Sequence, residues 1–136
     1  MKLFLVFWTI FALVSAEWVP RTSDQMYKDQ AECFKQLELT KEEQEKVKKE
    51  DFPDEPKFRC YLRCILMGGQ IWDDEKGYNP ERAYAELLNI HMTADVENLR
   101  KCNTQNLHHS DSCTRAFRVV KCFANNNYIT SIKPKS

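Results

Sequence analysis

The sequence predicts an all-α, single-domain protein that folds in an oxidising compartment. Apolar residues recur at the three-to-four-residue spacing of amphipathic helices, and only three glycines occur in 136 residues. All six cysteines lie after residue 16. An even number of cysteines in a short secreted chain is typical of a disulfide framework, here three bonds.

Residues 1–16 have the pattern of a secretory signal peptide. Lys2 is followed by an apolar run, and Val14, Ser15 and Ala16 supply short side chains at the expected cleavage site. The run is shorter than the roughly 20 apolar residues that a bilayer-spanning helix needs. We therefore expect cleavage after Ala16, a secreted extracellular domain of residues 17–136, and no stable membrane insertion.

Charge argues against a nucleic-acid partner. Once Lys2 is removed, the Lys and Arg residues number one fewer than the 20 Asp and Glu residues, and no basic run stands out. The three histidines and the cysteines lack the spacing of a zinc site. We expect neither a metal nor another cofactor.

The first two helices have matching start signals. Thr22 to Gln25 fits a capping box, and the following residues place Cys33 and Phe34 on one apolar face. Thr40 to Glu43 fits a second capping box, which opens a short charged helix that ends near Lys49.

The third and fourth helices follow prolines. Pro56 suits the first turn of a helix that runs to Gly68-Gly69, and residues 70–78 are expected to form a loop. Asn79-Pro80 then starts the fourth helix. Its apolar stripe comprises Ala83, Tyr84, Leu87, Leu88 and His91.

Two further helices complete the prediction. Thr93 is expected to cap the fifth helix, which leads to Cys102. Ser110 is expected to cap the sixth helix, which runs to residues 125–127. The sixth helix is apolar over most of its circumference, which favours burial within a bundle. In the tail after it, Tyr128, Ile129 and Ile132 are spaced so that they could close one mouth of a cavity.

Helix geometry limits the disulfide pairing. Cys60 and Cys64 are one turn apart on the third helix, at about 6 Å, whereas a disulfide needs Cβ atoms about 3.5–4.5 Å apart. Cys113 and Cys122 lie on opposite sides of the sixth helix, about 13 Å apart along its axis. Excluding these two pairs leaves about ten of the 15 pairings open.

The cysteine spacing resembles that of the insect odorant-binding proteins, the pheromone- and general-odorant-binding family of six-cysteine type. Two intervals carry the resemblance, Cys60-x3-Cys64 and Cys113-x8-Cys122, and the segment 116–127 resembles the family's last helix. The resemblance implies the disulfides Cys33–Cys64, Cys60–Cys113 and Cys102–Cys122. It also implies a compact bundle of about six helices around an internal apolar cavity, stapled by three interlocked disulfides.

On this resemblance, we expect a secreted carrier that binds small hydrophobic molecules such as odorants, pheromones or fatty acids. Apolar faces of the third, fourth and sixth helices would line the cavity, with Arg59 and Arg63 turned to solvent and Ala124 on the inner stripe of the sixth helix. The expected ligand-binding residues are Phe58, Tyr61, Leu62, Ile65, Leu66, Met67, Trp72, Tyr84, Leu87, Leu88, His91, Phe117, Val120, Phe123, Tyr128 and Ile129.

An enzyme is not expected. The sequence has no Gly-x-Ser-x-Gly or His-Glu-x-x-His motif, and it lacks the catalytic pattern of secreted phospholipases A2. The alternative is a secreted interaction protein, such as a salivary or haemolymph antagonist, that acts by binding another protein. A chemoreceptor partner, a homodimer, and a pH-sensitive gate involving the tail and His91, His108 or His109 are left open.

Overall fold

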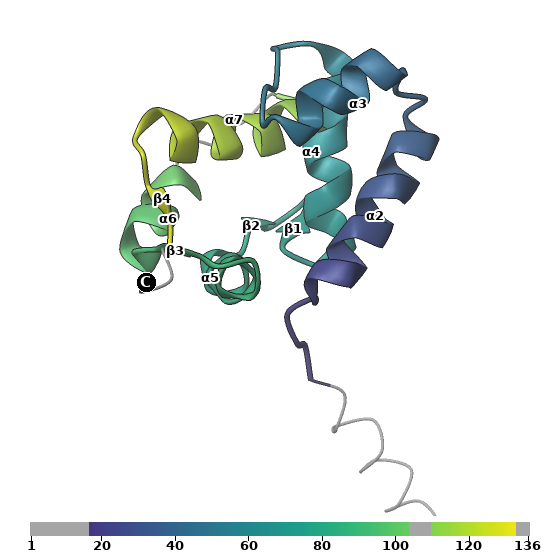
Figure 1. The fold of residues 1–136 in the computed structure, drawn as a ribbon. Coiled ribbons are helices and arrows are strands. Elements are labelled where there is room, and N and C mark those ends of the chain that lie inside the picture. Colours follow the sequence, from purple (N-terminus) through teal and green to yellow (C-terminus); the bar gives the residue numbers. More distant parts are fainter. Residues whose placement is uncertain (1–16, 104–109, 133–136) are drawn as a thin grey trace, which may run out of the picture.

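The computed structural model describes residues 17–103 and 110–132 (Figure 1). Within these ranges the fold is all-α, as predicted, with six helices and four very short strands. The helices are α2 Ser23–Gln36, α3 Lys41–Lys48, α4 Pro56–Gly68, α5 Pro80–Asn89, α6 Val96–Asn103 and α7 Ser112–Asn125. The strands are β1 Trp72–Asp73, β2 Gly77–Tyr78, β3 Met92–Ala94 and β4 Ile129–Ser131. The predicted signal peptide, His108 and His109 lie outside the described residues.

The helix starts follow local capping chemistry. Both predicted capping boxes are present, at Thr22 and at Thr40, and Pro56 and Pro80 occupy first-turn positions. The prediction that Thr93 caps the fifth helix is wrong, because Thr93 lies in β3 and Asp95 Oδ1 accepts from the amide of Glu97 at 2.9 Å.

The sequence prediction also placed the cap of the last helix one residue too early. Asp111, rather than Ser110, caps α7, and its carboxylate accepts from the amide and the hydroxyl of Thr114 at 2.9 and 2.8 Å. The Ser110 hydroxyl instead accepts a hydrogen bond from Arg118. At both helix starts, an aspartate carboxylate lies where the sequence predicted a hydroxyl cap. A carboxylate there also interacts favourably with the positive end of the helix dipole.

Two short antiparallel ladders occupy segments expected to be irregular. The predicted loop 70–78 contains the β1–β2 hairpin, in which Trp72 pairs with Tyr78. The tail forms β4, which pairs with β3 so that Ala94 lies opposite Ile129, and the amide of Ile132 donates to the carbonyl of His91 at 2.8 Å. The described part of the tail therefore contains a paired strand, which the sequence analysis did not predict.

Three disulfides join the helices in an interlocked order. Cys33–Cys64 links α2 to α4, Cys60–Cys113 links α4 to α7, and Cys102–Cys122 links α6 to α7. These are the pairs that the family resemblance implies. The helices thus surround the middle of the molecule, with α4 and α7 crossing on one side and α5 lying on the other (Figure 1). No helix in the described ranges is long and apolar enough to cross a membrane.

Five helices end in the same unusual way. The second residue after each of them has a positive φ angle of 53–59°, although none of the five is glycine. These residues are Glu38, Glu50, Gln70, His91 and Asn127. After α3, the amide of Asp51 donates to the carbonyl of Lys46 at 2.9 Å, which is the long-range bond of a Schellman motif. A side chain in this left-handed conformation costs about 1–2 kcal/mol.

Glu50→Gly should therefore stabilise the protein, by up to about 1 kcal/mol after the greater flexibility of glycine in the unfolded chain is subtracted. The free energy of unfolding in denaturant measures the effect. The matched control is Glu45→Gly in the exposed interior of α3, which should cost about 1 kcal/mol. An equal loss of stability in both variants would show that the positive φ angle of Glu50 carries no such cost.

Candidate functional site

The buried apolar residues form two separate clusters. The first cluster lies among α2, α3, α4 and α7 and comprises Cys33, Phe34, Leu39, Val47, Phe58, Tyr61, Leu62 and Phe117. The second lies among the β1–β2 hairpin, α5, α6 and α7 and comprises Ile71, Trp72, Tyr78, Ala83, Leu99, Cys102, Ala116, Val119 and Phe123. A domain of this size usually has one contiguous core. The division indicates that the interior between the clusters is incompletely packed.

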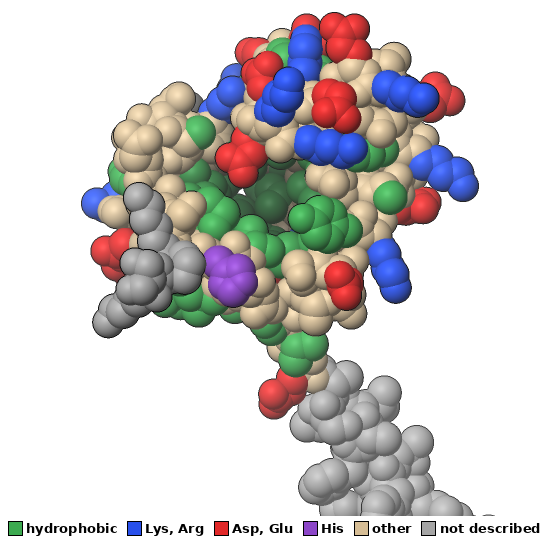
Figure 2. All heavy atoms as spheres, in the orientation of Figure 1, with side chains coloured by type: hydrophobic (Ala, Val, Ile, Leu, Met, Phe, Trp, Pro, Cys, Tyr) green, Lys and Arg blue, Asp and Glu red, His purple; other side chains and the backbone are tan. Residues whose placement is uncertain are grey.

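The surface of the molecule is hollowed between the helices that carry the two clusters. Figure 2 shows this hollow, with hydrophobic side chains lining it. Half-buried apolar side chains pack against both clusters: Ile65 and Val120 against the first, and Leu66 and Leu87 against the second. The helices α4, α5 and α7 therefore each carry apolar surface that the two clusters do not fully cover.

The predicted ligand-binding residues fall into three groups. Phe58, Tyr61, Leu62, Trp72, Phe117 and Phe123 are buried within the clusters. Ile65, Leu66, Tyr84, Leu87, Val120, Tyr128 and Ile129 are half-buried and pack against them. Met67, Leu88 and His91 are exposed. Ligand contact by any of these residues stays a prediction.

Some exposed positions face away from the clusters. Met67 lines a separate groove of about 600 Å³ that runs over the disulfides Cys33–Cys64 and Cys60–Cys113. Ala124 is exposed, so its predicted place on the inner stripe of the last helix is wrong. His91 follows the end of α5, where its carbonyl anchors the tail.

A buried tyrosine near the hollow was missed by the sequence prediction. Tyr78 packs its ring on Phe123 with 5.1 Å between ring centroids, and Asn103 binds both its amide and its carbonyl. Burial, together with the negative charge of Glu86, raises the pKa of the Tyr78 phenol above its ordinary value. Tyr78 directly precedes the helix cap Asn79 and packs in one cluster with Ala83. This is the hydrophobic-staple pattern, a signal by which the sequence could have placed it.

The Asp74 carboxylate fastens the hairpin to two helices. It accepts from Arg63 Nε and Nη2 at 3.0 and 2.5 Å and from Trp72 Nε1 at 2.8 Å. Arg115 of α7 donates to the Asp74 carbonyl at 2.8 Å and lies over the Trp72 ring. Arg59 and Arg63 were predicted to face solvent, but both are half-buried, Arg59 beside Asp54 and Arg63 in this network. The Arg63 guanidinium holds the pKa of Asp74 well below its ordinary value.

No group of three or more His, Cys, Asp or Glu residues in the described ranges is arranged to hold a metal ion. Tyrosine hydroxyls occur on the helices around the hollow. One is that of Tyr61, which accepts from Gln30 Nε2 at 3.3 Å, and burial raises its pKa. These groups suit orientation of a ligand by hydrogen bonds.

Comparison with known proteins identifies related sequences and structures. The PBP/GOBP family model matches residues 15–126. Odorant-binding protein 22 of Aedes aegypti is 30% identical over 128 residues, which cover 93% of this chain and 92% of that protein. General odorant-binding protein 99a of Drosophila melanogaster is 28% identical, with full coverage of both chains.

The similar solved structures share the helical arrangement. A crystal structure of the Anopheles gambiae Odorant-binding Protein 22a superposes with a TM-score of 0.60 at 26% identity, covering 72% of this chain and 95% of that one. A structure of AgamOBP22a in the open status for ligand binding gives a TM-score of 0.61 at 25% identity, covering 74% of this chain and 89% of that one.

Asp74→Asn should reduce stability in a pH-dependent way. The ordinary pKa is 3.8 and the folded-state pKa is lower, so the carboxylate stabilises the fold above about pH 4–5 and loses this effect as the pH falls. The difference in unfolding free energy between wild type and Asp74→Asn should be largest near pH 6 and shrink toward pH 3. Denaturant unfolding at both pH values measures it. A difference independent of pH would show that Asp74 acts without its charge.

Proposed function

The chain belongs to the PBP/GOBP family, and on this premise we propose that it is a secreted carrier that binds small hydrophobic molecules in the hollow and transports them through extracellular fluid. The observation that carries the proposal is the uncovered apolar surface on α4, α5 and α7, which faces a hollow in place of a packed core. Leaving this surface uncovered forgoes about 25 cal/mol for each Å². A bound apolar molecule would recover that free energy.

The half-buried residues are the best candidates for ligand contact. Ile65, Leu66, Leu87 and Val120 retain surface that a ligand could cover, whereas Phe58 and Trp72 are already enclosed by protein. Odorants, pheromones and fatty acids share an apolar body with at most one polar end. The hydroxyls of Tyr84 and Tyr128 belong to half-buried side chains of the second cluster and are suited to bind such an end.

The competing proposal is a secreted protein that acts by binding another protein. The outer groove along Cys33–Cys64, with the exposed Met67, is the surface that such a partner would use. The hollow favours the carrier, because a protein whose only task is surface binding gains nothing from an unfilled interior. A chemoreceptor, which would receive the ligand, and a homodimer are compatible with the proposal.

Filling the hollow should weaken ligand binding. Val120→Trp places an indole where a ligand would lie and should weaken binding of the fluorescent probe N-phenyl-1-naphthylamine at least about tenfold, a loss of about 1.4 kcal/mol. The matched control is Ala124→Trp, one turn further along α7 at an exposed position, which should bind like wild type. Titration of the secreted protein by fluorescence, and displacement by a panel of fatty acids and odorants, measures both.

Two outcomes would contradict the carrier proposal. One is the absence of saturable, displaceable binding in wild type across the whole panel. The other is equal affinity in wild type and Val120→Trp with the melting temperature retained, which would place the probe outside the hollow. Either result would shift support to the protein-binding alternative.

A further inference from the structure

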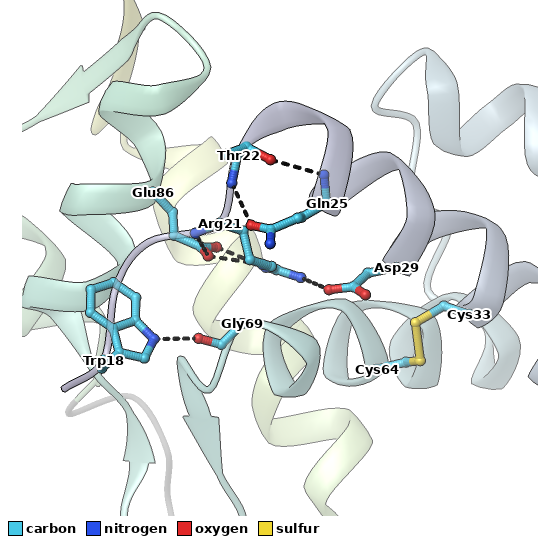
Figure 3. A network of polar contacts seen from close by, with 9 residues as sticks. All are labelled: Trp18, Arg21, Thr22, Gln25, Asp29, Cys33, Cys64, Gly69 and Glu86. Carbon is cyan, nitrogen blue, oxygen red and sulfur yellow. Dashed lines mark hydrogen bonds and ion pairs between the residues drawn. A yellow bond between two sulfur atoms is a disulfide. The ribbon is translucent and has the colours of Figure 1, made fainter. Parts of the chain in front are cut away.

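The segment of residues 17–22 lies along the seam where α5 meets the ends of α2 and α4 (Figure 3). Trp18 Nε1 donates to the carbonyl of Gly69 at the end of α4, at 2.9 Å. The guanidinium of Arg82, on α5, lies 5.0 Å from the centroid of the Trp18 ring. One side chain of the segment therefore contacts both sides of the seam.

Arg21 makes the strongest connection across this seam. Its Nε and Nη2 donate to the two carboxylate oxygens of Glu86 on α5, at 2.8 and 2.7 Å, and its Nη1 donates to Asp29 on α2 at 2.6 Å. Its backbone is held as well, because its amide donates to Glu86 and its carbonyl accepts from Asn89 at 2.8 Å. A single residue thus binds α5 at two positions and α2 at one.

The two glycines at the end of α4 make room for the guanidinium. A Cβ atom at Gly69 would lie 2.5 Å from Arg21 Nη2 and 2.7 Å from its Cζ. A Cβ at Gly68 would lie 2.9 Å from Asp29 Oδ2. The φ angle of Gly69 is −92°, which any residue adopts. Glycine is therefore needed at position 69 for close approach to Arg21, and the backbone conformation does not require it.

The pairing matters because Glu86 is buried. Its exposed fraction is 5%, it is the only charged residue among the buried residues of the described ranges, and its carboxylate depends on Arg21 for its charged partner. Removing one partner of a buried ion pair is strongly destabilising, since the other charge is left without compensation. The main contacts of α5 are with β3 and α6. Across the seam, the Arg21–Glu86 pair therefore acts together with the hydrogen bond from Arg82 Nη1 to the Gln70 carbonyl, at 2.9 Å, to hold α5 to the α2 and α4 side of the molecule.

We propose that Arg21 is a positioning residue that fixes α5 as a wall of the hollow, and that the Arg21–Glu86 pair thereby sets the rate at which an apolar ligand enters and leaves. This inference rests on the proposed carrier function. An apolar ligand held against the walls of the hollow is released faster when a wall moves away from it, and the frequency of such local motion depends on the contacts that hold the moving element. Since α5 carries Tyr84 and Leu87 against the second cluster, freeing α5 widens the hollow and removes part of the apolar wall that a ligand would contact.

The test uses two variants that disturb the seam in different ways. Gly69→Ala displaces the Arg21 guanidinium sterically without changing a charge. Arg21→Lys keeps the charge but loses the bidentate contact with Glu86. The matched control is Lys49→Ala, which occupies the corresponding position after α3, with a φ angle of −90° and an exposed side chain. Stopped-flow fluorescence measures the association and dissociation rates of N-phenyl-1-naphthylamine, and hydrogen exchange reports opening of the α5 amides.

Both seam variants should release the probe at least about tenfold faster than wild type and should exchange the α5 amides faster. The association rate should also rise, so that affinity changes less than either rate, which a general loss of stability would not produce. Lys49→Ala should match wild type. Unchanged rates and unchanged α5 exchange in Arg21→Lys, with or without a lower melting temperature, would overturn the proposal.

The carrier function and the role of Arg21 can fail separately. If wild type takes up no probe, the carrier function fails, and α5 exchange alone decides whether Arg21 positions α5. If wild type binds the probe and both seam variants exchange it at the wild-type rate, the carrier function stands and the gating role of Arg21 is wrong.

Discussion

Cys60–Cys113 joins α4 to α7 with 4.5 Å between the two Cα atoms, and each of the other two disulfides also ends on one of these helices. In the loop-entropy description, cross-links spanning 20 to 53 residues each stabilise a fold by about 3–4 kcal/mol. Because α2 is bonded to α4 and α6 to α7, the helices keep their arrangement even where side chains do not fill the space between them. The disulfides therefore permit a divided core, which would be costly in a protein stabilised by packing alone.

The helices α3 and α5 lie outside this covalent arrangement, since none of the disulfides reaches them, and of these two it is α5 that carries uncovered apolar surface toward the hollow. The helix α5 is attached by packing on its own side of the molecule and, across the seam, by Arg82, which contacts the Trp18 ring and the Gln70 carbonyl, and by Glu86, which binds Arg21. The wall with non-covalent attachment is the one that can move without straining a cross-link. The two kinds of contact therefore have separate roles. The disulfides hold α2, α4, α6 and α7 together, and the Arg21–Glu86 pair holds α5 against them.

Much of the fold followed from local signals in the sequence. Thr22, Thr40, Pro56 and Pro80 marked helix starts correctly, because capping depends on only three or four neighbouring residues. The β3–β4 ladder was missed because three-residue strands carry no periodic signal and β4 acquires its partner from a distant segment. The Arg21–Glu86 contact spans 65 residues, so nothing near either residue predicts it. Apolar periodicity likewise indicated which helix faces turn inward, but could not separate enclosed residues such as Phe58 from half-buried ones such as Ile65.

The central claim is that an apolar ligand lies between the two clusters. Nuclear Overhauser effects between a bound, isotope-labelled fatty acid and the methyl groups of the protein test it most directly. We expect contacts from one ligand to Ile65 and Val120, which pack against the first cluster, and to Leu66 and Leu87, which pack against the second. Contacts confined to Leu37 and Met67 in the outer groove, with none to these four residues, would contradict it.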